Sequence, residues 1–362
     1  MKIVLTGGGT GGHAYPALSI ADALRSELPD CQLLYLGSKD GLEARLAAAA
    51  GMPFSGLTSR RLKKQLSLDS LFTGISLARG LVEAWVALSR FKPDLVIGTG
   101  GYAAAAVVLA QGLRRGKTLI HEQNVVPGRT NLWLSRFASR ICVTFEDSTK
   151  YFPVEKTVVT GLPIRSELLR LPEKEEARVE LGLERRMFTI LVLGGSQGAR
   201  RLNQVIADAV PVLSKLQVQV LHQTGERDYG DAEQRRKAVG WDHYEVRAYF
   251  HDMRSAYGAA DFVISRCGAS TVAEITAVGL PAILVPYPHA YADHQRYNGE
   301  FVARNGGGMV VNDEDLNTNL LVRTIERFLA SPEELERMAE ASRRLGRPNA
   351  ARDIAVIAAE MR

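Results

Sequence analysis

The chain has 362 residues, of which 46% are hydrophobic and 23% are charged, and it contains three cysteines. That length suits two domains of roughly 150 residues each, and the composition is that of a soluble globular α/β protein. Cys31, Cys142 and Cys267 are odd in number and have no CxxC spacing, which disfavours a disulfide scaffold and a zinc site and fits a reducing cytosol.

The net charge of +5 is unevenly spread along the chain. Between Arg60 and Arg140 there are 13 Lys and Arg against 4 Asp and Glu, an excess of 9, so the remainder carries about −4 (5 minus 9). A basic segment in one half predicts an anionic partner there, either acidic lipid or a polyphosphate substrate. No nucleic-acid partner is expected, because no helix-turn-helix, zinc or RNA-binding signature accompanies the charge.

Neither the N-terminus nor the most apolar stretch of the chain suggests membrane insertion. The opening run MKIVLTGGG has too few apolar residues before its glycines for a signal peptide. The most apolar stretch, Ala103–Ala110, is far shorter than the ~20 residues that a membrane span needs. We therefore expect a cytoplasmic protein that is at most peripheral to a membrane.

The chain begins with a pattern typical of a phosphate-binding loop. Lys2–Thr6 reads as a buried strand, the glycine-rich turn GGGTGGH covers Gly7 to His13, and helical periodicity follows. Glycines let the backbone approach an anion that any Cβ would exclude. No acidic residue closes the next strand, near Leu33–Leu36, which disfavours NAD. His13 lies beside the helix start, so we favour a functional role for it over a structural one.

The segment Arg60–Phe91 predicts an amphipathic helical region. Its apolar positions recur at helical spacing, and basic residues surround them: Leu68, Leu71, Phe72, Ile75, Val82 and Trp85, with Arg60, Arg61, Lys63, Lys64, Arg79, Arg90 and Lys92. One interpretation is a helix packed on the sheet through its apolar face. The other is a surface that adsorbs to an anionic bilayer and inserts Phe72 or Trp85.

Two further strand ends carry polar groups. Asp94–Gly98 reads as a strand that ends in a second glycine turn, Thr99–Tyr102, before an alanine-rich helix. Lys117–Ile120 reads as the next strand, and the polar run His121–Asn124 follows it. Ligands collect at the carboxyl ends of parallel strands, so we expect these residues in a site.

The second half repeats this plan. Thr189–Leu193 reads as a strand, and Gly194–Arg200 as a glycine turn that opens a helix. Two halves that each begin strand, glycine turn, helix predict two Rossmann-like domains. The charged stretches Glu173–Arg186 and Glu226–Lys237 are interpreted as solvated helices and loops without chemistry.

The stretch from Ser265 to Asn298 predicts a sugar-nucleotide site. A strand, Ala260–Ser265, leads into the small residues CGAST and then a helix over Val272–Val278, whose amino end would bind a phosphate. Glu274 lies one turn into that helix, where a carboxylate can accept bonds from ribose hydroxyls. A second strand, Pro281–Pro286, precedes a loop that carries Asp293, His294, Gln295 and Asn298.

Six motifs together resemble one family. In order they are GGGTGGH, GTGGY, HEQNVVPGRTN, VVTGLPI, GASTVAEI and LPAILVPYPHAYADHQRYN. They resemble the MurG family, the N-acetylglucosaminyltransferases that make lipid II from lipid I in bacterial peptidoglycan synthesis. The resemblance runs from Gly7 to about Gly308. Leu162 departs from it, since the family usually has Asn at this position.

The resemblance implies an α/β protein of the GT-B fold, with two Rossmann-like domains whose parallel sheets face a central cleft. Residues 1–162 would form the acceptor and membrane-binding domain, with 341–362 packing back on it, and residues 163–340 the UDP-sugar domain. The implied reaction moves N-acetylglucosamine from UDP-N-acetylglucosamine to the C4 hydroxyl of MurNAc in undecaprenyl-pyrophosphoryl-MurNAc-pentapeptide, with inversion. The implied location is the cytoplasmic face of the inner membrane, against its anionic surface, alongside other cell-wall synthesis proteins.

The reaction suggests roles for individual residues. His13 is the candidate base, or the residue that orients one, and Glu122 is the reserve. The leaving UDP would be neutralised by Arg165, Ser196 and the helix start at Ala269, Ser270, Thr271, Val272 and Ala273. Glu274 would hold the ribose, Gln295 and Asn124 the sugar hydroxyls, and the backbone near Phe250 the uracil. Thr10, Gly11 and Gly12 would face the substrates. No cofactor or metal is expected, because no DxD-type carboxylate pair stands in a suitable loop.

Two rival classes stay open at this point. One is another GT-B enzyme, either a diacylglycerol glycosyltransferase or a UDP-sugar 2-epimerase. The former should lack HEQN followed by GRTN, and the latter should lack the basic amphipathic segment. The other class is a non-catalytic membrane scaffold, against which His13, Arg165, Glu274 and Gln295 speak.

Overall fold

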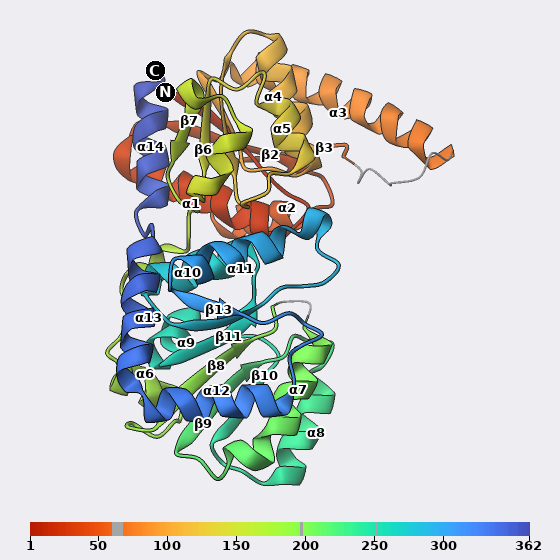
Figure 1. The fold of residues 1–362 in the computed structure, drawn as a ribbon. Helices are drawn as coiled ribbons and strands as arrows, with labels where there is room; N and C mark the ends of the chain where they lie inside the picture. Colours follow the sequence, from red (N-terminus) through yellow and green to blue (C-terminus); the bar gives the residue numbers. More distant parts are fainter. Residues whose placement is uncertain (60–67, 196–197, 251) are drawn as a thin grey trace. The chain divides into compact units, whose positions relative to one another are not determined.

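The computed structural model describes residues 1–59, 68–195, 198–250 and 252–362, with the side chains of 68–77 outside the description. The chain divides into two compact units. Unit 1 comprises Met1–Arg165 and Arg347–Arg362, and unit 2 comprises Ser166–Gly346 (Figure 1). Each unit is an α/β layer structure around one parallel sheet, as the sequence predicts.

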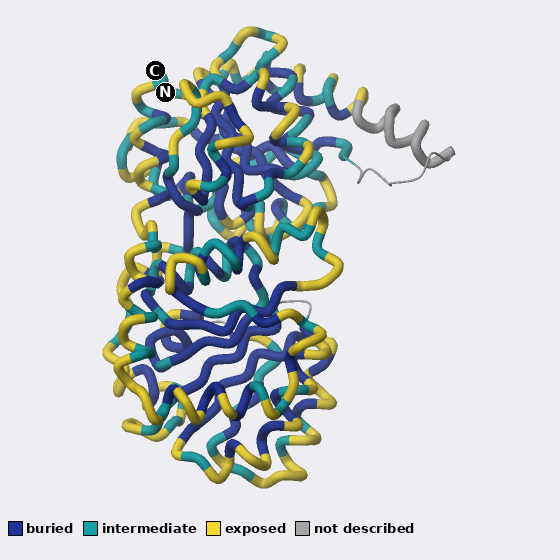
Figure 2. Tube along the Cα trace, in the orientation of Figure 1, coloured by how far each residue is buried: buried dark blue, intermediate teal, exposed yellow. Residues whose placement is uncertain are grey.

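Unit 1 contains a seven-stranded parallel sheet in the order β3-β2-β1-β4-β5-β6-β7. Its strands are β1 (Lys2–Thr6), β2 (Gln32–Ser38), β3 (Phe54–Leu57), β4 (Leu95–Gly98), β5 (Lys117–Glu122), β6 (Arg140–Val143) and β7 (Thr157–Val159). The central strands are buried on both faces, which explains their unbroken apolar runs (Figure 2).

The helices of unit 1 cover both faces of this sheet. They are α1 (Gly11–Glu27), α2 (Leu42–Ala49), α3 (Leu68–Phe91), α4 (Tyr102–Leu113), α5 (Arg129–Leu134) and α14 (Ala350–Glu360). Ile3 and Leu5 of β1 pack with residues of α1 and α14. Val4, the residue between them, packs on the opposite face with residues of α3 and α4. This alternation is the period of two that a strand imposes on its side chains.

Unit 2 has a six-stranded parallel sheet in the order β10-β9-β8-β11-β12-β13. Its strands are β8 (Phe188–Leu193), β9 (Val218–Gln223), β10 (Tyr244–Arg247), β11 (Phe262–Arg266), β12 (Ala282–Val285) and β13 (Gly308–Val310). Its helices are α6 (Lys174–Glu180), α7 (Arg200–Leu213), α8 (Tyr229–Val239), α9 (Met253–Ala259), α10 (Ala269–Val278), α11 (His294–Arg304), α12 (Thr318–Ala330) and α13 (Pro332–Leu345). Both sheets confirm the prediction of two Rossmann-like halves.

Two local predictions need correction, and a third is covered only in part by the described residues. β5 continues through His121 and Glu122, so the first two residues of the polar run belong to the strand and are buried. His294, Gln295 and Asn298 lie on α11 and not in a loop. The helix predicted within Arg60–Phe91 is α3, and the predictions for Arg60 to Lys64 and for the Phe72 side chain fall outside the described residues. In the part of the chain that is described, no helix is long and apolar enough to cross a membrane.

Candidate functional site

Each sheet changes direction of winding at one point, and glycine turns flank both points. In unit 1 the order reverses between β1 and β4, and in unit 2 between β8 and β11. In open parallel sheets, ligands bind in the crevice beyond the strand ends at such a switch point. The strands that flank these points lead into α1, α4, α7 and α10.

These four helices leave their amino ends available to an anion. At each of the four helices, no described N-cap side chain accepts a hydrogen bond from the helix. None of the four helices has an acidic residue among the described residues of its first turn. Elsewhere in the chain, α9 and α12 are capped by Asp252 and Asn317, and α2 and α8 begin with acidic residues. Because first-turn N–H groups and the helix dipole attract negative charge, the four switch-point helices are suited to phosphate.

The two glycine turns of unit 1 pack directly against each other. The backbone N–H of Gly8 donates to the carbonyl oxygen of Gly100 over 3.2 Å. A Cβ on Gly7 would overlap the Thr99 hydroxyl, and one on Gly101 would overlap the Gly8 carbonyl. Gly100 and Gly101 also have φ of 102° and 89°, which side chains rarely adopt. The turns therefore require glycine for contact and for conformation.

His13 is held by this interlocked pair of turns. Its Nδ1 lies 3.0 Å from the carbonyl oxygen of Thr99. Gly100 packs under the ring, since a Cβ there would lie 2.8 Å from Nδ1. A carbonyl oxygen can only accept, so Nδ1 carries the proton and Nε2 carries the lone pair of the neutral ring. The ring is half-buried at the first turn of α1.

The same carbonyl oxygen of Thr99 connects to a second, buried histidine. Gln123 donates from Nε2 to Thr99 O over 2.7 Å and approaches Nδ1 of His121 at 3.1 Å. Nε2 of His121 lies 2.8 Å from the carbonyl oxygen of Gly161. Burial lowers the pKa of His121 to about 4, so this ring is neutral at physiological pH. His121 is therefore part of the framework that supports the site.

Glu122 is buried and fully engaged by its own loop. Oε1 accepts from the backbone N–H of Asn124 over 3.0 Å, and Oε2 accepts from the backbone N–H of Gly128 over 3.2 Å and from Asn131 Nδ2 over 2.8 Å. Burial raises the pKa of its carboxyl group. Asn124 is half-buried, and its carbonyl oxygen accepts a bond from the Ser148 hydroxyl.

In unit 2, Glu274 is held by a tyrosine that the sequence did not single out. Tyr257 of α9 is 1% exposed, and its hydroxyl donates to Oε2 of Glu274 over 3.0 Å. Ala269 and Val272 are buried at the start of α10, whereas Ser270, Thr271 and Ala273 are half-buried. Gly268 precedes the helix, and a Cβ there would lie at van der Waals distance, 3.9 Å, from the Thr271 hydroxyl. Glu274 thus lies close to an amino end suited to phosphate.

The other residues that the sequence predicts to bind the UDP-sugar have specific hydrogen-bond partners. Oε1 of Gln295 accepts from the backbone N–H of Tyr287 over 3.0 Å, and Nδ2 of Asn298 donates to the carbonyl oxygen of Cys267 over 3.2 Å. The backbone N–H of Phe250 donates to Gln223 Oε1 over 3.0 Å, so that N–H is already used. Ser196 lies outside the described residues, and Arg165 is half-buried at the end of the first segment of unit 1.

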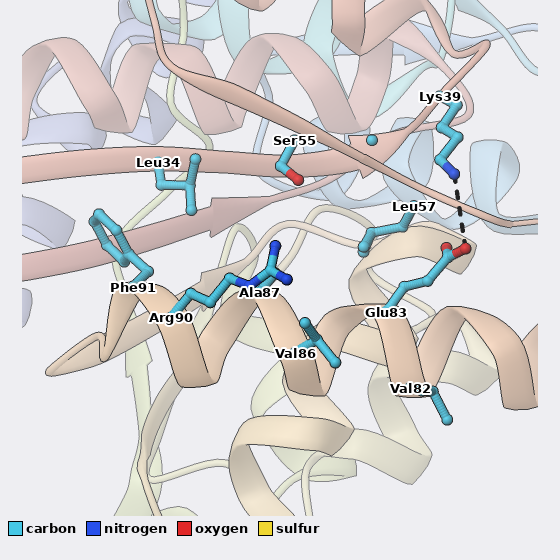
Figure 3. Close-up of a pocket in the computed structure, with 11 residues that line it drawn as sticks. Leu34, Lys39, Ser55, Leu57, Val82, Glu83, Val86, Ala87, Arg90 and Phe91 are labelled. Atoms are coloured by element: carbon cyan, nitrogen blue, oxygen red, sulfur yellow. Dashed lines mark ion pairs between the residues drawn. The ribbon is translucent and has the colours of Figure 1, made fainter.

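A groove of about 540 Å³ lies beside α3, between this helix and the edge strand β3 with its neighbour β2. Figure 3 shows Leu34 and Phe91 at one end and the ion pair between Lys39 and Glu83 at the other. Val82 and Val86 of α3 line it and are 63% and 41% exposed. The exposed Trp85 stacks against the Arg114 guanidinium at 5.3 Å.

Two family models match the chain. The glycosyltransferase family 28 N-terminal domain matches residues 3–143, and the C-terminal domain of the same family matches residues 189–355. The crystal structure of MurG from Acinetobacter baumannii covers 99% of both chains with a TM-score of 0.78 and 29% identity. The fold and the site thus define the class, a glycosyltransferase with the GT-B fold.

Full-length relatives narrow this class. A protein of Desulfitobacterium hafniense is 42% identical over 356 residues, 97% of this chain and 96% of its own. One of Desulforamulus reducens is 42% identical over 361 residues, 98% of this chain and 97% of its own. Both are named UDP-N-acetylglucosamine–N-acetylmuramyl-(pentapeptide) pyrophosphoryl-undecaprenol N-acetylglucosamine transferase. The chain belongs to this family of transferases.

A putative UDP-N-acetylglucosamine 2-epimerase from Listeria monocytogenes also shares the fold. It has a TM-score of 0.70 at 13% identity and covers 98% of this chain. At that identity the likeness concerns the fold alone. The rival interpretation as an epimerase therefore gains no functional support from it.

Proposed function

We propose that this enzyme transfers N-acetylglucosamine from UDP-N-acetylglucosamine to the C4 hydroxyl of MurNAc in undecaprenyl-pyrophosphoryl-MurNAc-pentapeptide. The observation that carries the proposal is 42% identity over 97% of the chain to a transferase of that name. The geometry of both switch points fits this chemistry, because each presents helix amino ends to an anion. The product would serve peptidoglycan synthesis, and through it cell shape and division.

In the proposed reaction, unit 2 binds the donor. The first-turn N–H groups of α10, from Ala269 to Thr271, bind the diphosphate, and Glu274 accepts bonds from the ribose hydroxyls. Gln295 and Asn124 contact sugar hydroxyls, Ser196 the diphosphate, and the carbonyl of Phe250 the uracil. The assignments of the described residues rest on their chemistry, on their positions in the fold and on the likeness to the family, and that of Ser196 rests on its chemistry and that likeness alone.

His13 is the proposed base. The acceptor C4 oxygen attacks C1 of N-acetylglucosamine, and its proton passes to Nε2 of His13. The bond between C1 and the UDP oxygen breaks at the same time, and the electron pair leaves with UDP. Attack from the side opposite the leaving group inverts C1. The new negative charge on UDP is stabilised by the amino end of α10 and by Arg165, in place of a metal.

Glu122 is less suited to this role. Each of its oxygens already accepts hydrogen bonds from its own loop, which contains Asn124 and Gly128. A base must accept the substrate proton within hydrogen-bond reach, and Glu122 would have to release its loop first. We assign Glu122 to shaping the loop that presents Asn124.

We also propose that α3 adsorbs to the anionic cytoplasmic face of the inner membrane. The exposed side chains of Val82, Trp85 and Val86 lie together on this helix, near Arg90 and Arg114. Apolar insertion and basic attraction add to each other at such a surface. This location would bring a soluble donor and a lipid-linked acceptor to one enzyme, among other cell-wall synthesis proteins.

The experiment offers two acceptors to the purified protein together with labelled UDP-N-acetylglucosamine. A water-soluble short-chain lipid I analogue should receive the label, and diacylglycerol should not. Released N-acetylmannosamine or its UDP derivative would identify an epimerase. Labelled diacylglycerol with an unlabelled lipid I analogue would refute the proposal, as would the absence of transfer to any acceptor.

A further inference from the structure

A buried carboxylate lies behind the glycine turn that follows β1. Glu43, in the first turn of α2, is 1% exposed. Its Oε2 accepts from the backbone N–H of Gly9 over 3.2 Å, and its Oε1 accepts from the backbone N–H of Ser38 over 2.9 Å. Glu43 therefore ties the end of β2 to the turn after β1.

Three glycines make room for this one carboxylate. A Cβ on Gly8 or Gly41 would overlap the carboxylate itself, and a Cβ on Gly37 would lie 2.6 Å from Glu43 Cγ. None of the three has a positive φ. Gly41, at φ −82° and ψ 159°, has a conformation open to any residue. The carboxylate, and not the backbone, explains glycine at position 41.

Burying the Glu43 carboxylate costs free energy, and its hydrogen bonds to the backbone offset this cost. A carboxylate removed from water is destabilising unless hydrogen bonds satisfy it, and its two donors here are backbone amides, one in the turn after β1 and one at the end of β2. Gly9, which it holds, has a φ of 83° and directly precedes the N-cap residue Thr10. On the other side of the turn, the Tyr35 hydroxyl donates to the carbonyl oxygen of Gly7 over 2.5 Å. The turn is thus fixed from two sides.

We propose that Glu43 is a positioning residue for the transfer reaction. It fixes the Gly7–Thr10 turn, and that turn sets both the amino end of α1 and the ring of His13 for the acceptor. The inference rests on the proposed function for its readout. Because the donor site is in unit 2, the defect should appear in acceptor use and catalysis while UDP binding stays intact.

The first variant is Glu43→Gln, which keeps the shape but replaces one acceptor oxygen with an N–H donor facing a backbone N–H. We expect kcat/KM for the soluble lipid I analogue to fall by about 10- to 100-fold, because small displacements of catalytic groups have effects of this size. The acceptor KM should rise and kcat should fall. The Kd for UDP, measured by calorimetry, should stay within about twofold, well below one tenfold step.

The second test changes Gly41, a glycine that makes room for the Glu43 carboxylate. Gly41→Ala places a methyl group against the carboxylate without straining the backbone, so it should reproduce the defect. In a Glu43→Ala background the methyl group has space, and Gly41→Ala should then add no further loss. This cycle remains informative if Glu43→Gln folds poorly. Independent, additive losses would overturn the proposal.

The matched control is Asp94→Asn. Asp94 also accepts a backbone N–H, that of Lys2 over 2.7 Å, but at the amino ends of β1 and β4, away from the turns that follow these strands. The Asp94→Asn variant should transfer the sugar at the wild-type rate. If wild type transfers and Glu43→Gln matches it in kcat and acceptor KM, Glu43 has no positioning role. If wild type itself fails on the lipid I analogue while binding UDP, it is the proposed function that fails.

Discussion

The Nδ1 atom of His13 lies 3.0 Å from the carbonyl oxygen of Thr99, so the turn after β4 fixes the tautomer of a histidine on α1. The neutral ring then carries its lone pair on Nε2, as a base requires. Replacement of His13 by Ala should lower kcat by about 10²- to 10⁴-fold, the usual range for loss of a general base.

The control for this prediction is His243→Ala, in unit 2. Steady-state kinetics with the soluble acceptor would be measured for both variants, together with UDP affinity. His13→Ala should bind UDP like wild type, and His243→Ala should retain activity. A His13→Ala enzyme with wild-type kcat would remove His13 from the chemistry.

Donor affinity should depend on a tyrosine as well as on a carboxylate. Glu274→Ala should weaken UDP binding by ~1.5–3 kcal/mol, the value of a hydrogen bond to a charged group. The Tyr257 hydroxyl bonds Glu274 Oε2 over 3.0 Å, so Tyr257→Phe should cost less, ~0.5–1.5 kcal/mol. In the double variant the losses should not add, because Tyr257 acts through Glu274.

Calorimetric titration with UDP measures these effects. Tyr229→Phe is the matched control, since Tyr229 is exposed on α8 of the same unit. UDP affinity unchanged by Glu274→Ala would take Glu274 out of the donor site. If the two losses of UDP affinity were fully additive in the double variant, Tyr257 would not act through Glu274.

Membrane adsorption should depend on the exposed apolar residues of α3. Val82→Glu with Val86→Glu should release the protein from anionic vesicles, because each inserted side chain contributes at most ~1.5–3 kcal/mol and each added carboxylate is repelled. Turnover on the soluble acceptor should survive. Vesicle co-sedimentation at moderate salt measures the effect.

A control with the same change of charge is available in unit 1. Val154→Glu with Val356→Glu alters two exposed valines away from α3, which are 82% and 39% exposed. This variant should still co-sediment. If the α3 variant also stays on the vesicles, the membrane surface lies elsewhere on the protein.

Acid should destabilise the fold through its buried histidines. Burial lowers the pKa of His121 to about 4 and that of His222 to about 3, from 6.5 for the unburied group. Between 6.5 and these values the unfolded chain binds more protons than the folded one, so stability falls as pH falls through this window. Each histidine should contribute a slope of about 1.4 kcal/mol per pH unit there.

His222→Gln isolates one of these contributions. His222 contacts the Tyr244 hydroxyl and Asn203, and it has no assigned part in catalysis. Urea unfolding between pH 6 and 4.5 should show a slope lower by one proton in the variant. Equal slopes would mean that His222 does not titrate on unfolding.

The fold was largely predictable because its signals are local. Apolar runs such as Lys2–Thr6 and Thr189–Leu193, each followed at once by glycines, indicate strand, turn and helix without any knowledge of distant contacts. The pattern predicts that the strand ends at Ile120, two residues before its true end at Glu122, because the polar side chains of His121 and Glu122 conceal a buried strand. The hydrogen bonds that permit this burial form only in the folded chain: His121 bonds the distant Gly161, and Glu122 bonds its own folded loop.

The supporting residues of the site were harder to predict for the same reason. Thr99 acts on His13 through a backbone carbonyl, which leaves no trace in residue type. Tyr257 is separated from Glu274 by 17 positions and reads as an ordinary core residue. Glu43 did leave a signal, since glycines at 37 and 41 flank it, but the reason for those glycines is visible only in three dimensions.

The most direct test of the account is the structure of the product. The disaccharide formed from UDP-N-acetylglucosamine and the short-chain lipid I analogue should be isolated and its new anomeric proton observed by NMR. Because a base on the acceptor side and a leaving group on the opposite side invert C1, the α-linked donor should give a β-linkage to the MurNAc C4 oxygen, seen as a large diaxial coupling. An α-linked product, linkage to another hydroxyl, or no disaccharide from enzyme that binds UDP would contradict the account.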